Sequence, residues 1–423
     1  MKYAAIPLVL AALQVCAAEN LIEIGGRQYW LNGINLPWIR WEDFDDPWGS
    51  NNYNHDDFED AFQRYADHGI NAVRVWVHCK GEGSPVLNAD AEVTGPPDVF
   101  HDNFSDMMAL ASQYSVFVMP ALFSFDILKD ERVITKYPHN TASNFAVLVA
   151  SEEKTQTYID NFLVPLLERY DTCSALFCWE VCNEPEWMSE NLGADQNDVI
   201  RFNAQIAAAI HEHGAKPVST GAASLKWYGV QHDWWSDAAL QEQYDDANAC
   251  FDIVQVHYYD WMNPSGEDDW GFDPFMNSTA ELGLDDRPVI IGETPGDGGA
   301  YRTATEMYET AYDLGYAGVF AWSDQAGDGI ASFAEISEAT DAFYSNHQDI
   351  VDGLETSTRR RPSAKHAPAR GSADTEPAMY DLQGRRMRPT ERPYSPGAIR
   401  AGRAPGTYIV RTKTIPYVTH VTR

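Results

Sequence analysis

Two glutamates follow apolar, strand-like runs of the sequence. Glu184 comes directly after the run Ala175–Asn183, and Pro185 then prevents a strand from continuing. Glu293 ends a second run, Pro288–Glu293. Two carboxyl groups at one place suit hydrolysis of a glycosidic bond, because one donates a proton to the departing oxygen while the other attacks or stabilises the sugar carbon. Like charges placed close together also push their pKa values apart.

Two residues near the ends of other runs suit an ionised Glu293. Arg74 lies in the run Asn71–His78, and Tyr259 follows the run Phe251–Tyr258. Arginine is a fixed cation, so Arg74 is expected to keep Glu293 ionised. The hydroxyl of Tyr259 is expected to donate a hydrogen bond to the same carboxylate.

Three further residues are candidates for contacts with the sugar or with Glu184. Asn183 is expected to hold the sugar 2-hydroxyl, where hydrogen bonds strengthen in the transition state. His257 is expected to orient Glu184 or to tune its proton affinity. Trp322 is expected to form an apolar floor under the sugar ring. Each of these residues alone is more often simple packing, and two glutamates alone can be ion-paired surface residues, so the prediction depends on the whole set.

Strand-like and helical patterns alternate along the chain, which predicts parallel strands joined by helices. The expected strands are Tyr29–Leu36, Asn71–His78, Val116–Phe123, Ala175–Asn183, Pro217–Thr220, Phe251–Tyr258, Pro288–Glu293 and Gly318–Ser323. Eight apolar strands favour a closed (β/α)8 barrel, whose active site lies at the C-terminal ends of the strands. The alternative is an open doubly wound sheet, although no glycine-rich phosphate loop follows the first strand.

Several segments resemble motifs of clan A glycoside hydrolases, closest to family 5, the cellulase and β-mannanase family. These segments are "NAVRVWVH", "WEVCNEPE", "DIVQVHYYDW", "PVIIGETPG" and "GVFAWSD", together with "LNGINLPW" in the first strand. The resemblance covers about residues 25–350. It implies a retaining mechanism, with Glu184 as acid/base and Glu293 as nucleophile. By motif position it also implies supporting roles for Arg74, Asn183, His257, Tyr259 and Trp322.

The third strand departs from that family. Many members place a histidine at its end, where this chain has Ser124 or Asp126. The resemblance implies an endo-acting enzyme for a plant cell-wall β-1,4-polysaccharide, and "WEVCNEPE" and "VRVWV" are more similar to the mannanase forms than to the cellulase forms.

Many tryptophans fall at or just beyond the expected strand ends. They are Trp38, Trp41, Trp48, Trp187, Trp234, Trp235, Trp261 and Trp270. Apolar faces of sugars stack on such rings, which favours an extended polysaccharide cleft, although about half are expected to be simple packing.

A non-catalytic carbohydrate-binding protein on the same scaffold is the alternative function. It would also use aromatic loops, but it would not need both Glu184 and Glu293. We expect no metal and no cofactor, because no cysteine has the spacing of zinc ligands. Five cysteines follow residue 18, which is an odd number, so at least one lacks an intramolecular partner. One disulfide is possible, but the sequence does not determine which cysteines would form it.

Charge and the N-terminus bear on location and partners. The formal net charge is −33, which argues against nucleic acid or an anionic membrane as the main partner. Residues 1–18 read as a signal peptide with Lys2, an apolar stretch and a small-residue cleavage site, and no run is long enough to cross a bilayer. The chain is therefore expected to be secreted or at the cell surface; a lipid-modified Cys16 is the alternative.

The composition changes near the C-terminus. Residues 19–354 are expected to form the catalytic domain, and 355–378 form a linker rich in Pro, Ser, Ala and Arg. Residues 379–423 are predicted to form a small basic β-rich module. It resembles sorting or anchoring modules of some Gram-negative exported enzymes, which implies secretion machinery or surface anchoring as a partner. The alternative is an accessory β module or a poorly ordered basic tail.

Overall fold

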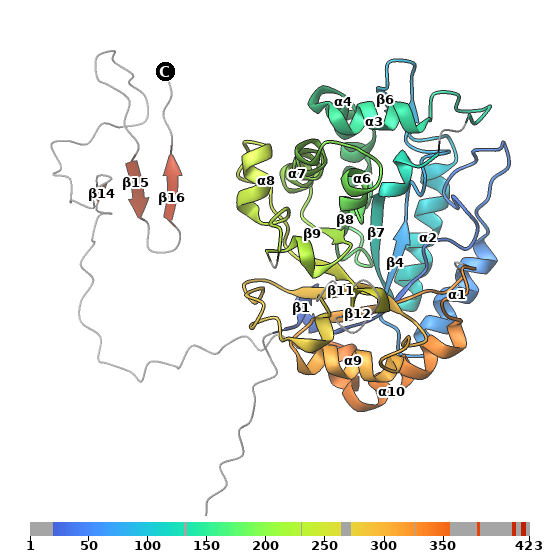
Figure 1. Cartoon of the computed structure of the whole chain (residues 1–423), viewed down its shortest axis with the longest axis vertical. Coiled ribbons are helices and arrows are strands. Elements are labelled where there is room, and N and C mark those ends of the chain that lie inside the picture. Colours follow the sequence, from blue (N-terminus) through green and yellow to red (C-terminus); the bar gives the residue numbers. More distant parts are fainter. Residues whose placement is uncertain are drawn as a thin grey trace, which may run out of the picture. The chain divides into compact units, whose positions relative to one another are not determined.

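Eight parallel strands form a closed barrel (Figure 1). The computed structural model describes residues 20–355, apart from 131–132, 230, 264–271 and 326, and three short strands nearer the C-terminus. The barrel strands are β3 (Leu31–Asn35), β4 (Ala72–Trp76), β7 (Phe117–Ser124), β8 (Trp179–Asn183), β9 (Val218–Ala222), β10 (Val254–His257), β11 (Val289–Pro295) and β12 (Gly318–Trp322). β12 pairs with β3, which closes the barrel. The predicted (β/α)8 barrel is confirmed, and the open-sheet alternative is wrong.

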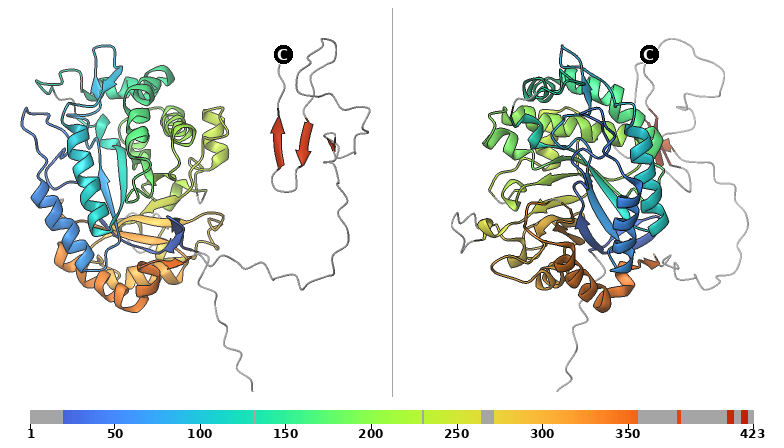
Figure 2. Two further views of the ribbon diagram at one scale, coloured as in Figure 1. Left: turned by 180° about the vertical axis from the view of Figure 1, so that it is seen from behind. Right: turned by 90° about the vertical axis from the view of Figure 1, so that its right-hand side faces the viewer.

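Helices surround the barrel, as the views from behind and from the side show (Figure 2). They are α1 (His55–Asp67), α2 (Phe100–Tyr114), α3 (Ala142–Ala150), α4 (Glu152–Tyr158), α5 (Val164–Tyr170), α6 (Glu186–Glu190), α7 (Gln196–His213), α8 (Asp237–Gln243), α9 (Ala304–Asp313) and α10 (Phe333–Val351). A π-helical turn, η2 (Ile159–Leu163), joins α4 to α5, and the short 3₁₀ turns are η1 (Phe125–Leu128), η3 (Leu225–Trp227), η4 (Asp260–Met262) and η5 (Pro274–Met276).

Local sequence sets the helix starts. The Asn54 side chain accepts a hydrogen bond from the Asp57 amide at the start of α1. Thr303 and Glu306 form a capping box at the start of α9. Such caps satisfy amide groups that have no partner within the helix. None of the helices among the described residues has the length and apolar character that a membrane span requires.

A small antiparallel sheet lies at the N-terminal end of the barrel. It consists of β1 (Ile22–Ile24), β2 (Arg27–Tyr29) and β13 (Leu354–Glu355), with β2 in the middle. Tyr29 pairs with Ile22 in this sheet, so the first barrel strand begins at Leu31 rather than at Tyr29 as the sequence predicted. A separate hairpin joins β5 (Val86–Leu87) to β6 (Val93–Gly95).

The chain divides into two compact units, Met1–Thr356 and Ser357–Arg423. In the second unit, β14 (Met379–Tyr380), β15 (Tyr408–Arg411) and β16 (Pro416–Thr419) pair in an antiparallel sheet. The predicted signal peptide at 1–18 lies outside the described residues. So do the predicted linker beyond Glu355 and the predicted module at 379–423 apart from these strands, so these three assignments stay predictions.

The barrel interior differs between its two ends. Near the N-terminal ends of the strands, it is filled by an apolar cluster that includes Leu31, Met119, Cys178, Ile253 and Ile290. Closer to the C-terminal ends, the same strands bury charged and polar side chains, among them Arg74, Glu180 and Gln255 at 0% exposure. Burial of charge is stable only where partners satisfy it, so this second layer defines the candidate site.

Candidate active site

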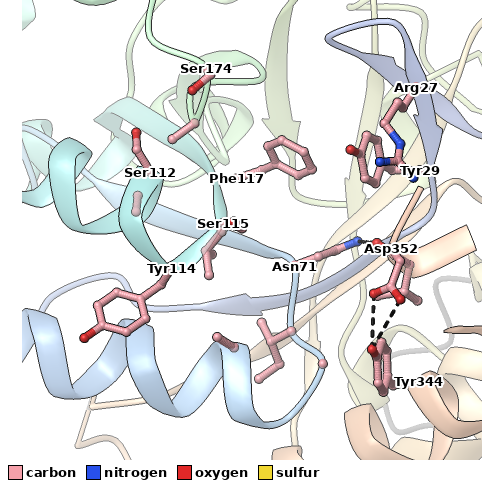
Figure 3. A pocket seen from close by; sticks show the side chains of 17 residues that line it. Arg27, Tyr29, Asn71, Ser112, Tyr114, Ser115, Phe117, Ser174, Tyr344 and Asp352 are labelled. Carbon is pink, nitrogen blue, oxygen red and sulfur yellow. Dashed lines mark hydrogen bonds between the residues drawn. The ribbon is translucent and has the colours of Figure 1, made fainter. Parts of the chain in front are cut away.

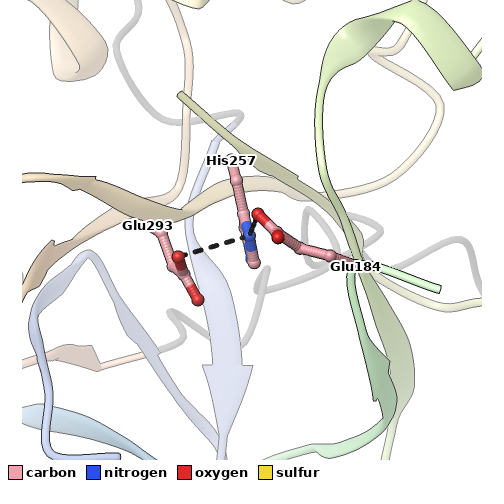
Figure 4. Close-up of side chains that lie close together, drawn as sticks. All are labelled: Glu184, His257 and Glu293. Carbon is pink, nitrogen blue, oxygen red and sulfur yellow. Dashed lines mark hydrogen bonds and ion pairs between the residues drawn. The ribbon is translucent and has the colours of Figure 1, made fainter. Parts of the chain in front are cut away.

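Glu184 lies immediately beyond β8, where the strand passes into α6 (Figure 4). Its φ of 48° is in the left-handed region that a non-glycine residue rarely adopts. His257 Nδ1 lies 3.0 Å from Glu184 Oε1, and Trp187 Nε1 donates to Glu184 Oε2 at 3.0 Å. The Glu184 side chain is 14% exposed, so a bound molecule can reach a carboxyl group that protein contacts already hold in place.

Glu293 faces Glu184 from β11. Its Oε1 accepts a hydrogen bond from Arg74 Nη1 at 2.7 Å, and its Oε2 accepts one from the Tyr259 hydroxyl at 2.8 Å. His257 Nδ1 is 3.6 Å from the same Oε2. One histidine nitrogen therefore lies between the two carboxyl groups (Figure 4).

The two glutamates have different electrostatic surroundings. Burial raises the pKa of Glu184 to about 7, although Arg74 and the Trp187 hydrogen bond oppose this rise. Burial also raises the pKa of Glu293. The charge that His257 carries when its ring is protonated and the charge of Arg74 oppose this rise, while the charge of Glu184 adds a smaller upward contribution. Burial lowers the pKa of His257 to about 4, so its ring is neutral at neutral pH. Burial is thus the main cause of the shifts, whereas the sequence argument had emphasised repulsion between the glutamates.

Arg74 has a stronger partner than the predicted one. Its Nε and Nη2 each donate to a different oxygen of Glu180 at 2.6 Å, in addition to the contact with Glu293. Sequence reasoning missed Glu180, because this residue lies inside an apolar strand rather than at its end. The sequence did contain an indication of this pair. Arg74 and Glu180 both lie in apolar strands of one barrel, and a buried arginine is stable only when a carboxylate pairs with it.

Asn183 joins the same network. Its Oδ1 accepts from Arg74 Nη2 at 2.8 Å, and its Nδ2 donates to Ser124 Oγ at 3.3 Å. Ser124 in turn donates to Asp126 at 2.8 Å. These residues occupy the end of the third barrel strand, where many family 5 members have a histidine. The serine keeps a hydrogen-bonding contact to Asn183 there.

Trp322 ends β12 and packs in an aromatic group. Its ring is 5.8 Å from that of Trp76 and 6.4 Å from that of Trp38, and Trp41 packs edge-on against Trp38. These rings lie beside the strand ends that carry the polar network. The structure therefore brings all seven predicted residues, from Arg74 to Trp322, to one end of the barrel.

The loop tryptophans divide into two classes. Trp234 and Trp235 are buried at 4% and 1% exposure, so they are packing residues. Trp38, Trp41, Trp187 and Trp261 are half-buried, and Trp48 is 56% exposed. Trp270 lies outside the described residues. The half-buried rings and Trp48 are the ones that an extended ligand can reach.

A carboxylate next to the site was also missed by sequence reasoning. Glu186, two residues after Glu184, is buried and accepts hydrogen bonds from Trp235 Nε1 at 2.6 Å and from the Ala223 amide at 3.1 Å. Burial raises the pKa of Glu186 to about 8. It fixes α6 to the loop after β9 and so helps to hold the backbone that carries Glu184.

Glu184, His257 and Glu293 are the one group, within the described part of the chain, whose potential metal-ligand atoms all lie within 4.8 Å of one another. Arg74 Nη1 already donates to Glu293 Oε1 at 2.7 Å, and the Tyr259 hydroxyl donates to its Oε2. A divalent ion would have to compete with these donors for Glu293, so the arrangement suits proton transfer better than metal binding.

A cavity of about 530 Å³ lies at the other end of the barrel (Figure 3). Residues that precede β4, β7 and β8 line it, such as Asn71, Val116 and Ala175. Its Asp352 accepts hydrogen bonds from Tyr344. This end of a (β/α)8 barrel serves stability rather than chemistry, so we do not assign the cavity to the substrate.

The five described cysteines are all free thiols, and burial raises the pKa of Cys79, Cys178 and Cys182 well above the ordinary value. The disulfide that the sequence allowed is therefore not formed among these five cysteines. Buried protonated thiols act here as small apolar side chains.

Comparison with known proteins identifies the family. The model of the cellulase family, glycosyl hydrolase family 5, matches residues 31–327. A mannan endo-1,4-β-mannosidase from Mytilus edulis is 27% identical over 336 residues, covering 71% of this chain and 85% of that protein. One from Cryptopygus antarcticus is 26% identical over 336 residues, covering 72% and 82%.

Solved structures show the same fold. That of an endo-1,4-β-mannanase from Eisenia fetida matches with a TM-score of 0.66 at 23% identity, covering 79% of this chain and 95% of that one. The family match spans the barrel strands and both glutamates. The chain therefore belongs to glycosyl hydrolase family 5 and is a glycoside hydrolase.

Proposed function

We propose that this protein is a secreted, retaining endo-β-1,4-mannanase. The observation that carries the retaining mechanism is the approach of Glu184 and Glu293, which present oxygens within 4.8 Å of one another. Retaining enzymes hold their two carboxyl groups about 5 Å apart, whereas inverting enzymes hold them well beyond 6 Å to admit a water.

In the first step, Glu293 attacks the anomeric carbon and Glu184 gives its proton to the departing oxygen. Glu184 suits the acid role, because burial raises its pKa to about 7 and keeps the proton in place in mildly acidic solution. Burial raises the pKa of Glu293, and Arg74 and Tyr259 oppose this rise by donating to its two oxygens. These two donors favour the ionised form that the nucleophile role requires.

In the second step, Glu184 takes a proton from water, which then attacks the same carbon and releases Glu293. The Trp187 N–H, which donates to Glu184 Oε2, stabilises the carboxylate that this step requires. Two displacements at one carbon return the original anomeric configuration. Asn183, held by Arg74, is positioned to bind the sugar 2-hydroxyl.

Mannan is the proposed substrate because the relatives from Mytilus edulis and Cryptopygus antarcticus are both named as acting on it. Half-buried tryptophans that follow different barrel strands, such as Trp38 after β3 and Trp187 after β8, suit a chain of sugars rather than a single one. Cellulose and mixed-linkage β-glucan are the competing substrates, since the matching family model is that of cellulases.

Secretion rests on the signal-like residues 1–18. For the C-terminal unit we propose sorting or surface anchoring, because its basic composition and linker set it apart from an acidic barrel. Truncation after Thr356 keeps β13 intact and should leave hydrolysis of soluble mannan unchanged while export or surface retention falls. Loss of the folded barrel in this truncation would contradict a separate role for the unit.

The test of activity is a reducing-sugar assay with the purified protein on mannan, glucomannan, carboxymethyl cellulose, xylan and mixed-linkage glucan. We expect the highest kcat/KM on mannan or glucomannan and a rapid fall in viscosity, which marks endo action. Proton NMR of the first products should show the β anomer. A first-formed α anomer would contradict retention, and binding without hydrolysis would favour a non-catalytic carbohydrate-binding protein.

A further inference from the structure

A buried glutamine lies beneath the two carboxyl groups, and the mechanism above does not use it. Gln255 is on β10, two residues before His257, and is 0% exposed. Its Nε2 lies 3.0 Å from Glu180 Oε2 and 3.5 Å from His257 Nε2. Its Oε1 lies 3.3 Å from Ser219 Oγ.

The partners of Gln255 determine which way its amide points. Glu180 forms a two-pronged ion pair with Arg74 and is therefore an ionised carboxylate, which only accepts hydrogen bonds. The Gln255 atom that faces Glu180 must then be the NH₂ nitrogen. The Ser219 hydroxyl, which donates to the Ile253 carbonyl oxygen at 2.9 Å, lies 3.3 Å from the amide oxygen on the other side. The second hydrogen of the same NH₂ group is left to point towards His257 Nε2.

The amide in turn determines the tautomer of His257. An N–H donor facing Nε2 requires a lone pair on that nitrogen. The ring is neutral, because burial lowers the pKa of His257 to about 4. A neutral imidazole with a bare Nε2 carries its hydrogen on Nδ1. The charged groups around the ring are Arg74, Glu180, Glu184 and Glu293. Nδ1 lies 3.0 Å from Glu184 Oε1 and 3.6 Å from Glu293 Oε2, and an Nδ1–H can donate to either oxygen while Glu184 carries its proton on Oε2.

We propose that Gln255 is a positioning residue that fixes His257 in the Nδ1–H tautomer and so directs its one N–H towards Glu184 and Glu293. This inference rests on the proposed function only for its kinetic consequence. In this tautomer the N–H stabilises the anion that Glu184 becomes after giving up its proton. In the opposite tautomer, a lone pair would face two carboxyl groups and would compete with the leaving group for the proton of Glu184.

Neighbouring strands leave space for this arrangement. A Cβ atom at Gly221 would lie 2.5 Å from Glu180 Oε1, 3.0 Å from Gln255 Nε2 and 3.1 Å from His257 Nε2. A Cβ atom at Gly292 would lie 2.4 Å from Gln255 Nε2. Neither glycine has the left-handed backbone that favours this residue type. Each glycine is therefore explained by the close approach of the buried polar side chains, which leaves no room for a Cβ atom.

The direct test is the tautomer of His257 in the resting wild-type enzyme. A long-range ¹H–¹⁵N correlation spectrum of protein labelled with ¹⁵N-histidine distinguishes a protonated ring nitrogen from a bare one. The His257 signals are those lost in His257→Asn. We expect a protonated Nδ1 and a bare Nε2 at pH 7. The reverse pattern, or an imidazolium, would overturn the proposal.

The second test replaces the donor by an acceptor of the same shape. In Gln255→Glu, the side chain can still bond Glu180 through a carboxylic O–H, but it faces His257 with an oxygen that accepts. We expect the Nε2–H tautomer and a fall in kcat of about 100-fold, with KM little changed, as for loss of acid–base catalysis. Ser219→Ala is the matched control: it removes a contact on the oxygen side of the amide and should keep the wild-type tautomer and kcat.

Gln255→Met keeps the proposal testable if the glutamate variant does not fold. It removes the donor without adding an acceptor, so both tautomers of His257 should appear in the spectrum. A wild-type tautomer and wild-type kcat in both variants would overturn the assignment. A wild-type spectrum with protonated Nδ1 in a protein that hydrolyses no polysaccharide would contradict the proposed function and support the tautomer.

Discussion

The two ends of the barrel interior are built on opposite principles. Residues near the strand starts, such as Met119 and Ile290, form an apolar cluster that needs no partners. Residues closer to the C-terminal ends of the barrel strands, such as Arg74 and Glu180, are charged, fully buried and joined by short hydrogen bonds. The apolar layer stabilises the fold through burial of apolar side chains. In the polar layer, hydrogen bonds and ion pairs hold the buried polar groups in place. Substitutions in the two layers should therefore have different consequences.

The largest effect should come from the polar layer at Glu293. Glu293→Ala should abolish turnover of every glycoside, because no covalent intermediate can form. Release of dinitrophenol from an activated β-mannoside and release of reducing sugar from mannan measure the two kinds of substrate. Rescue of this variant by azide with a β-glycosyl azide as product would show that the roles of the two glutamates are reversed.

Glu184→Ala should behave differently from Glu293→Ala. A dinitrophenyl glycoside needs little protonation to depart, so its first step should survive, while the second slows by about 100-fold or more for lack of a base. The glycosyl-enzyme should then accumulate, as a burst of dinitrophenol and a mass shift on the protein. Azide needs no base, so it should restore the rate and give a β-glycosyl azide. An unchanged rate would contradict any catalytic role for Glu184.

Glu180→Gln tests the claim that the polar layer depends on its internal pairing. This change leaves the buried guanidinium of Arg74 without one of its two carboxylates. Removing one member of a buried pair costs about 3 kcal/mol of unfolding free energy, and kcat should fall with it because Arg74 also holds Glu293 and Asn183. Urea unfolding and kinetics on the same preparation measure both. Full stability together with full activity would mean that the pair does not organise the layer.

A smaller effect in the polar layer is expected on the pH dependence of kcat/KM. Glu184 must be protonated in the free enzyme, so kcat/KM should fall as the pH rises through about 7. The Trp187 N–H stabilises the charged form of Glu184 and lowers its pKa. Trp187→Phe removes this donor, so the pKa of Glu184 should rise and the alkaline limb should move to higher pH. A shift to lower pH would contradict the assignment of Glu184 as the acid.

The smallest effect on activity is expected in the apolar layer. Ile290→Val removes one buried methyl group and should lower the free energy of unfolding by about 1 kcal/mol. Glu293, three residues further along β11, should keep its contacts, so kcat and the pH profile should not change. A fall in kcat as large as that of Glu180→Gln would show that the two layers are coupled rather than separable.

Much of the barrel could be predicted from the sequence, because the periodicity of apolar residues and the order of strand-like and helical segments indicate the fold. Apolar runs that alternate with helical patterns predicted the eight strands, and residues at the ends of those runs predicted the cluster around Glu184 and Glu293. Glu180 and Gln255 were missed for one reason. Both lie inside apolar strands, where burial of a polar group is stable only with partners from other strands, and those partners are set by barrel closure. Periodicity along one strand does not contain that information.

The tautomer of His257 and the raised pKa of Glu184 are also beyond sequence patterns. They depend on separations between atoms of Glu184, just beyond β8, and of residues on β10 and β11. The shift of the first strand to Leu31 has a similar origin, because Tyr29 pairs with Ile22 in a hairpin instead of entering the barrel.

That hairpin has a practical consequence. Because β2 pairs with both β1 and β13, the first and last strands of the barrel unit lie on either side of one strand, at the end opposite the carboxylates. A short peptide should therefore be able to join residues near Ile22 and Glu355, and new ends opened in an exposed loop elsewhere would give a circular permutant with the same eight strands. For the same reason, immobilising the enzyme on a solid support through either end of this unit should leave the catalytic opening free to meet an insoluble polysaccharide.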